Sequence, residues 1–116
     1  MSIKVRLTED EENIILSTEM AKRKGIERDH VHMIRALSNI IEESNIDAER
    51  IEELNKKYKL NEVKGRKQHM YRCSAKSVNK LWQMRMDYHY SMEKIVWAIL
   101  YDKKEKMLAS TDKQGI

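Results

Sequence analysis

The chain is poor in the residues that build covalent or glycine-rich sites, with one cysteine and three glycines in 116 residues. The single cysteine, Cys73, excludes a disulfide within the chain and fits a reducing compartment. The glycines, Gly25, Gly65 and Gly115, lie far apart, so there is no glycine-rich loop of the kind that binds nucleotide phosphates. A disulfide scaffold and a phosphate-binding loop are therefore excluded.

Long apolar segments are also missing. No run approaches the roughly 18–20 residues that cross a bilayer, and the chain does not open with the charged, apolar and small segments of a secretory signal. We therefore expect a soluble, cytoplasmic protein with no membrane partner.

Residues that could form a catalytic or metal site are sparse. His69 and Cys73 are four apart and would share one face of a helix, but two ligands do not make a closed metal site. His30 and His32 are two apart, which a helix places on different faces. The acidic residues cluster where helices are predicted to start. We therefore expect no enzyme activity, no metal, no cofactor and no small-molecule substrate.

Size and charge set broad limits. A chain of 116 residues forms one small domain, or one small domain with an extension, and buries only a modest core, so oligomerisation would add stability. Charged residues make up 36% of the chain, and the net charge of +4 is compatible with an anionic partner.

The clearest local pattern lies at the start of the chain. Apolar and basic side chains alternate there in the order Ile3, Lys4, Val5, Arg6, Leu7. This period of two predicts a strand with one apolar and one basic face. A lone short strand cannot satisfy its own backbone groups, and no other clear strand lies nearby, so the expected partner is a second copy of the chain.

Helix signals follow the strand. Thr8 and Glu11 have the spacing of a capping box, which predicts a helix over residues 9–24 that ends before Gly25. A second helix is predicted after Asp29 to about residue 43, and a third over residues 48–59 with Asp47 as its N-cap.

Residues 1–43 resemble the ribbon-helix-helix DNA-binding proteins of the MetJ and Arc type. The resemblance rests on the strand IKVRL, on Ala21-Lys22-Arg23-Lys24-Gly25 and on Ile34-Arg35-Ala36-Leu37. It implies that two chains intertwine and that the outward side chains of their paired strands enter the major groove of DNA. The implied base-reading residues are Lys4 and Arg6, with Ser2 and Thr8 beside them.

The same resemblance implies two further sets of contacts. The start of the second helix would lie near a DNA phosphate, through Arg28, Asp29 and His30. The apolar strand residues, Ile3, Val5 and Leu7, would lie in the subunit interface. An alternative interpretation of Lys4 and Arg6 remains open, in which they only protect an exposed strand from aggregation.

A basic segment follows, in which residues 56–80 carry nine lysines and arginines against one acidic residue, Glu62. These cations could bind DNA phosphates, and Lys64, Arg66 and Lys67 are the candidates. The alternative is a solvated face or a linker.

Residues 74–106 are predicted as one long helix. An alternation of side chains over residues 84–92 leaves open a strand in the middle, with Ser91 as the cap of a separate helix over residues 92–106. The apolar stripe of this segment is predicted to form an oligomer interface; it comprises Trp82, Tyr88, Met92, Ile95 and Ile99. A partner-binding groove is the alternative for this stripe.

Together these signals predict a mainly α protein with a ribbon-helix-helix unit in residues 1–45, a helical oligomerisation region in residues 46–106 and a disordered tail in residues 107–116. We expect a sequence-specific double-stranded DNA-binding protein, a transcriptional repressor that binds repeated operator sites as a dimer or tetramer. One alternative is an auxiliary DNA-binding protein of a plasmid relaxosome or partition system. An alternative of another class is a helical interaction module that does not bind DNA.

Overall fold

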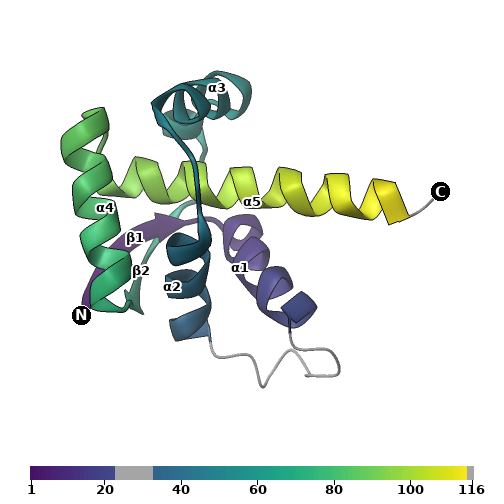
Figure 1. Ribbon diagram of the computed structural model, residues 1–116, viewed down its shortest axis with the longest axis horizontal. Helices are drawn as coiled ribbons and strands as arrows, with labels where there is room; N and C mark the ends of the chain where they lie inside the picture. Colours follow the sequence, from purple (N-terminus) through teal and green to yellow (C-terminus); the bar gives the residue numbers. More distant parts are fainter. Residues whose placement is uncertain (23–32, 115–116) are drawn as a thin grey trace.

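The computed structural model describes residues 1–22 and 33–114, and it is mainly helical with one two-stranded antiparallel sheet (Figure 1). The elements in chain order are β1 (Ser2–Leu7), α1 (Glu9–Lys22), α2 (Met33–Glu43), α3 (Ala48–Tyr58), the short 3₁₀ helix η2 (Leu60–Glu62), β2 (Lys67–Arg72), α4 (Ala75–Tyr88) and α5 (Met92–Gln114). No helix within these ranges has the length and apolar character needed to cross a membrane.

The first strand is present as predicted, but its partner is different from the one expected. β1 pairs antiparallel with β2 of the same chain, with Ile3 opposite Tyr71, Lys4 opposite Met70 and Arg6 opposite Gln68. The prediction that β1 pairs with a second copy of the chain is therefore wrong. The chain supplies both strands of the ribbon.

The second strand was not predicted from the sequence, because two of its three inward positions carry polar side chains. Lys67 and His69 occupy positions where a half-buried strand usually has apolar residues, and Lys67, at the end of the strand, is exposed. Glu12 of α1 makes this arrangement possible, since its Oε1 lies 3.3 Å from Nδ1 of His69 and accepts a hydrogen bond from the Tyr71 hydroxyl at 3.2 Å. His69 and Tyr71 therefore have a polar partner in α1, and β2 lacks the apolar alternation by which a half-buried strand is usually recognised.

Two of the predicted helix caps are confirmed, and the third, Asp29, lies outside the described residues. The Thr8 N–H donates to Oε1 of Glu11 at 2.8 Å, and the Glu11 N–H donates to Oγ1 of Thr8 at 3.0 Å, which completes the capping box. At the start of α3, Oδ1 of Asp47 accepts from the Arg50 N–H at 2.8 Å. These bonds satisfy backbone donors that the first turn of a helix leaves free.

The prediction of one long helix over residues 74–106 is wrong, because the chain breaks between α4 and α5. His89 is in the left-handed conformation with φ of 60°, and its N–H donates to the Arg85 carbonyl at 3.0 Å. Ser91 then caps α5, since its Oγ accepts from the Lys94 N–H at 3.1 Å. The alternative cap at Ser91 is therefore confirmed, whereas the strand over residues 84–92 is not formed.

The C-terminal boundary also differs from the prediction. α5 continues to Gln114, so residues 107–114 are helical and the predicted disordered tail is wrong for them. Figure 1 shows α5 along the longest axis of the molecule, with α3 on one side and α1 and α2 on the other. This helix packs against α1, α2, α3, α4 and β1.

One hydrophobic core joins the two predicted regions. Three buried residues of β1 and six consecutive buried residues of α5, 95–100, belong to the same cluster. Burial of one such large apolar side chain stabilises a fold by about 1.5–3 kcal/mol. Because the two predicted regions, residues 1–45 and 46–106, share this core, each stabilises the other. Five residues predicted to form subunit interfaces lie instead in the core of this chain, which corrects that prediction: Ile3, Val5, Leu7, Ile95 and Ile99.

Candidate nucleic-acid interface

The outward face of the β1–β2 ribbon is the candidate site. Side chains alternate along a strand, and directly opposed residues of an antiparallel pair project to the same face. Since residues 3, 5 and 7 of β1 face the core, the register assigns the opposite face to six exposed residues. We call this set the outer face: Ser2, Lys4, Arg6, Gln68, Met70 and Arg72.

The chemistry of the outer face is cationic and rich in hydrogen-bond donors. Three of its members are basic, and none is acidic. Arginine and lysine bind the guanine edge in the major groove, glutamine can pair with adenine, and an apolar group can contact the thymine methyl. Met70 is 63% exposed, so its thioether is available to contact a thymine methyl.

Glu93, in the first turn of α5, holds Arg6. Nη2 and Nε of Arg6 donate to Oε1 of Glu93 at 2.7 and 3.1 Å, and the Arg6 backbone N–H donates to Oε2 at 2.8 Å. Burial by itself would raise the pKa of Glu93, but these bonds hold it below its ordinary value. The bonds to Glu93 in turn raise the pKa of Arg6. Arg6 is thus directed toward the start of α5, at one edge of the outer face.

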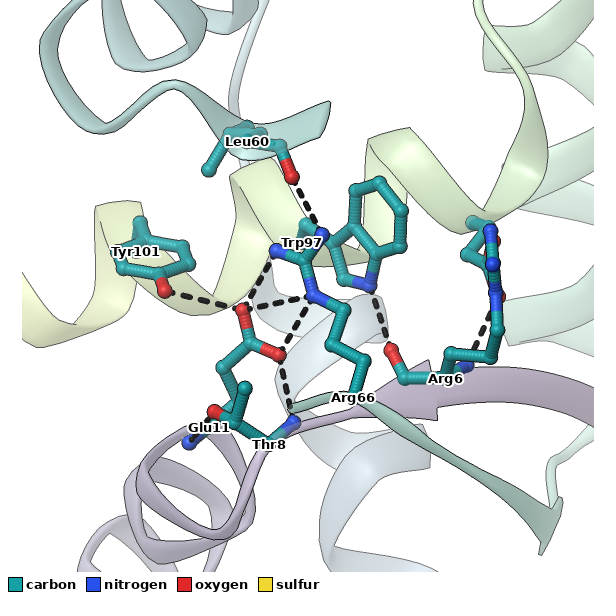
Figure 2. A network of polar contacts seen from close by, with 8 residues as sticks. Arg6, Thr8, Glu11, Leu60, Arg66, Trp97 and Tyr101 are labelled. Atoms are coloured by element: carbon teal, nitrogen blue, oxygen red, sulfur yellow. Dashed lines mark hydrogen bonds and ion pairs between the residues drawn. The ribbon is translucent and has the colours of Figure 1, made fainter. Parts of the chain in front are cut away.

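Trp97 of α5 links this helix to β1 by a hydrogen bond. Its indole Nε1–H donates to the carbonyl oxygen of Arg6 at 2.7 Å, and its side chain is buried (Figure 2). The guanidinium carbon of Arg66 lies 3.5 Å from the centroid of the Trp97 ring. A cation stacked on an indole in this way is attracted by the negative face of the ring.

Arg66 and Glu11 form a buried ion pair next to Trp97. Nη2 of Arg66 lies 2.7 Å from Oε2 of Glu11, and their side chains are 6% and 0% exposed. Arg66 also donates to the Leu60 carbonyl, and the Tyr101 hydroxyl donates to Oε2 of Glu11 at 2.9 Å (Figure 2). We call Glu11, Arg66, Trp97 and Tyr101 the buried ionic cluster.

The buried ionic cluster changes the acidity of its members. Burial by itself would raise the pKa of Glu11, but hydrogen bonds from Arg66, Thr8 and Tyr101 hold it below its ordinary value. Burial and the Glu11 carboxylate raise the pKa of Tyr101 to about 12. Glu11 is therefore ionised at neutral pH. Its contacts hold the C-terminal end of β1, the start of α1 and α5 in fixed positions relative to one another.

This placement corrects the prediction for Arg66. A guanidinium that is buried and bonded to Glu11 and Leu60 is not available to a DNA phosphate. Its neighbours Lys64 and Lys67 are exposed, but Lys67 is opposite Leu7 and therefore belongs to the other side of the ribbon from the outer face. Thr8 lies just beyond the strand, where its hydroxyl oxygen caps α1.

Three predicted residues, Arg28, Asp29 and His30, lie outside the described residues. The structure brings Ser2, Lys4 and Arg6 together with three residues that sequence analysis missed: Gln68, Met70 and Arg72. The signal that could have revealed them is an alternation of Gln68, Met70 and Arg72 with His69, Tyr71 and Cys73. From the predicted apolar stripe, Trp82 remains 47% exposed, while Tyr88 and Met92 are half-buried.

Metal ligands do not gather in the part of the chain that the structure describes. No group of three or more histidine, cysteine, aspartate or glutamate side chains there is arranged to hold a metal ion. His69 belongs to β2 and Cys73 follows it, so the two are not on one helix face as their spacing suggested. Burial raises the pKa of the Cys73 thiol, which disfavours the thiolate form that binds metals.

Comparisons with protein-family models, with curated proteins and with solved structures found no match to this chain. The function is therefore inferred from the geometry and chemistry of the outer face.

Proposed function

We propose that this chain binds double-stranded DNA by placing the outer face of its β1–β2 ribbon in the major groove. One observation carries the proposal: the six residues of the outer face are all exposed, three are cationic and none is acidic. The major groove is about 12 Å wide and admits a two-stranded ribbon, and its base edges offer partners to the side chains found here. β-ribbon proteins read DNA in this way.

The resemblance of residues 1–43 to ribbon-helix-helix proteins supports the proposal. In those proteins two chains contribute one strand each, whereas here β2 takes the place of the second strand. The biological role that we propose is transcriptional repression at operator sites. The same binding would also serve an auxiliary protein of a plasmid relaxosome or partition system.

A competing proposal is an interaction module that does not bind DNA. It is favoured by a groove of about 300 Å³ between β1, α4 and the start of α5, where the half-exposed Trp82 lies beside Met92 and Val96. An exposed tryptophan beside an apolar groove is a common feature of protein-binding surfaces. DNA binding by the outer face would separate the two proposals.

Selection of duplexes from a random pool, followed by affinity measurements, tests the proposal. We expect Lys4→Ala to weaken binding to the selected duplex by about 1–3 kcal/mol, or about 5- to 150-fold, because one base contact is lost. The matched control is Lys56→Ala, since Lys56 is exposed on α3 and changes the net charge equally. If no duplex is enriched, or if both variants bind like the wild type, the outer face does not read DNA.

A second expectation concerns Glu93, whose carboxylate lies beside the outer face. Glu93→Gln should strengthen DNA binding at low salt by about fivefold, on the order of 1 kcal/mol, because it releases Arg6 and removes a charge that repels phosphates. The gain should shrink in a salt series, and Glu62→Gln, an exposed change of the same charge, should show no comparable effect. Weaker binding by Glu93→Gln would instead mean that Glu93 holds Arg6 in its DNA-binding position.

A further inference from the structure

The order of elements contains a repeated unit. β1 is followed by α1 and α2, and β2 is followed by α4 and α5, while α3 and η2 connect the two units. Each strand has six residues. Each first helix is capped by a hydroxyl, with Oγ1 of Thr8 accepting from the Glu11 N–H and Oγ of Ser74 accepting from the Ser77 N–H, both at 3.0 Å. The chain thus contains two strand–helix–helix units whose strands pair with each other.

The two caps, Thr8 and Ser74, allow the units to be aligned. The alignment makes Lys4 equivalent to Met70, and these two residues are also directly opposite each other in the ribbon. In an antiparallel pair, equivalent positions that face each other mark the local two-fold axis. The axis of the ribbon therefore passes through the pair Lys4 and Met70, in the middle of the outer face.

The outer face does not obey this two-fold symmetry chemically. Arg6 and Arg72 are equivalent and lie at equal distance from the axis, one on each side. On the axis itself, however, the ammonium group of Lys4 is opposite the thioether of Met70. The remaining equivalent pair is a serine and a glutamine, Ser2 and Gln68. A ribbon built from two identical chains would have identical residues at each of these pairs.

The surroundings of the two arginines differ as well. Arg6 lies beside the start of α5, where the two carboxylate oxygens of Glu93 accept four hydrogen bonds from it. The corresponding arginine, Arg72, extends from β2, which packs against α2. The two halves of the outer face therefore present different donors to the two halves of a DNA site.

We infer that one copy of this chain recognises a non-palindromic duplex, with different bases under the β1 half and the β2 half of the ribbon. The inference rests on the proposed function. A single chain provides both strands, so the smallest complete complex has one chain for each duplex site. Lys4 donates to a guanine edge near the centre of the site, and Met70 contacts a thymine methyl on the other side of the axis.

The experiment starts from the duplex selected with the wild-type protein and measures the mass of its complex. We expect one chain for each minimal site and a selected sequence without two-fold symmetry. Two palindromes are then made, each from one half of the selected site and its inverted copy, and each should bind about tenfold or more weakly than the selected site. An exposed control change, Lys56→Ala, should leave these ratios as they are.

A variant that makes the centre of the ribbon symmetric provides an independent measurement. Met70→Lys places lysine on both sides of the axis, and Met70 is exposed, so the fold should persist. The variant should lose its preference for thymine under β2 and bind the β1-half palindrome better than the wild type does. A selected palindrome that binds two chains would overturn this inference but leave DNA binding intact. Failure to enrich any duplex would overturn both.

Discussion

Replacing Arg66 by methionine is expected to lower the free energy of unfolding by about 3–5 kcal/mol, the usual cost of removing one partner of a buried ion pair. The change leaves the Glu11 carboxylate fully buried without its guanidinium, and it also removes the cation stacked on Trp97. Stability is about 5–15 kcal/mol for typical domains, so the loss is large. Urea unfolding at neutral pH, followed by circular dichroism, measures it.

Two further variants control this experiment. Lys64→Met removes a cation from an exposed position close by and should change stability little. The double variant Glu11→Leu with Arg66→Met leaves no unpaired buried charge and should recover part of the loss. The recovery is incomplete because the Thr8 N–H and the Tyr101 hydroxyl lose the acceptor that Glu11 provides. If Arg66→Met is as stable as Lys64→Met, the pair does not hold the ribbon in place.

The pH dependence provides a second readout for the same change. The folded-state pKa of Glu11 lies below its ordinary value, so its contribution to stability is present above the unfolded-state pKa and is lost as the pH falls through the folded-state pKa. The stability difference between wild type and Arg66→Met should therefore narrow in acid. A difference that stays constant from neutral to acidic pH would assign the loss to packing against Trp97 instead.

Replacing Met70 by glutamate is expected to reduce DNA affinity by at least about 100-fold, since like charges brought together in an interface cost several kcal/mol. The new carboxylate would lie at the centre of the outer face, opposite Lys4, and would repel the phosphates while neutralising one base-reading cation. Because Met70 is 63% exposed, the fold should tolerate the change. The measurement is binding to the selected duplex at fixed salt.

Met86 offers a closely matched control for this variant. It is 69% exposed on α4, and Met86→Glu makes the same change in side chain and net charge away from the ribbon. Both variants should keep the helicity and mass of the wild type. Equal binding by Met70→Glu and Met86→Glu would show that the β1–β2 ribbon is not the DNA-contacting surface.

Several elements could be predicted from the sequence because their signals are local. The alternation in β1 assigns three side chains to the core and two cations to the outer face within five residues. The capping box of Thr8 and Glu11 and the cap of Asp47 act across three residues, so the helix starts follow from neighbouring side chains alone. The mainly helical class followed from these elements.

The candidate site was only half predictable. Lys4 and Arg6 could be assigned to an exposed strand face, but Gln68, Met70 and Arg72 belong to a strand with polar residues at two of its three inward positions. Its inward His69 and Tyr71 have Glu12 of α1 as their partner, and that contact exists only in the folded chain. The break before α5 likewise depended on a left-handed residue, His89, for which the sequence offers no glycine.

The sequence alone therefore determined where β1 begins and which of its faces is basic, because strand alternation and helix caps depend on residues within one turn or a few positions. The tertiary structure decided which strand β1 pairs with and which cations remain exposed. Arg66 illustrates the reason: it belongs to a basic segment, yet it is buried by Glu11, 55 positions earlier in the chain. Whether a charge stays in water depends on the partners that folding brings to it, and those partners lie far away in sequence.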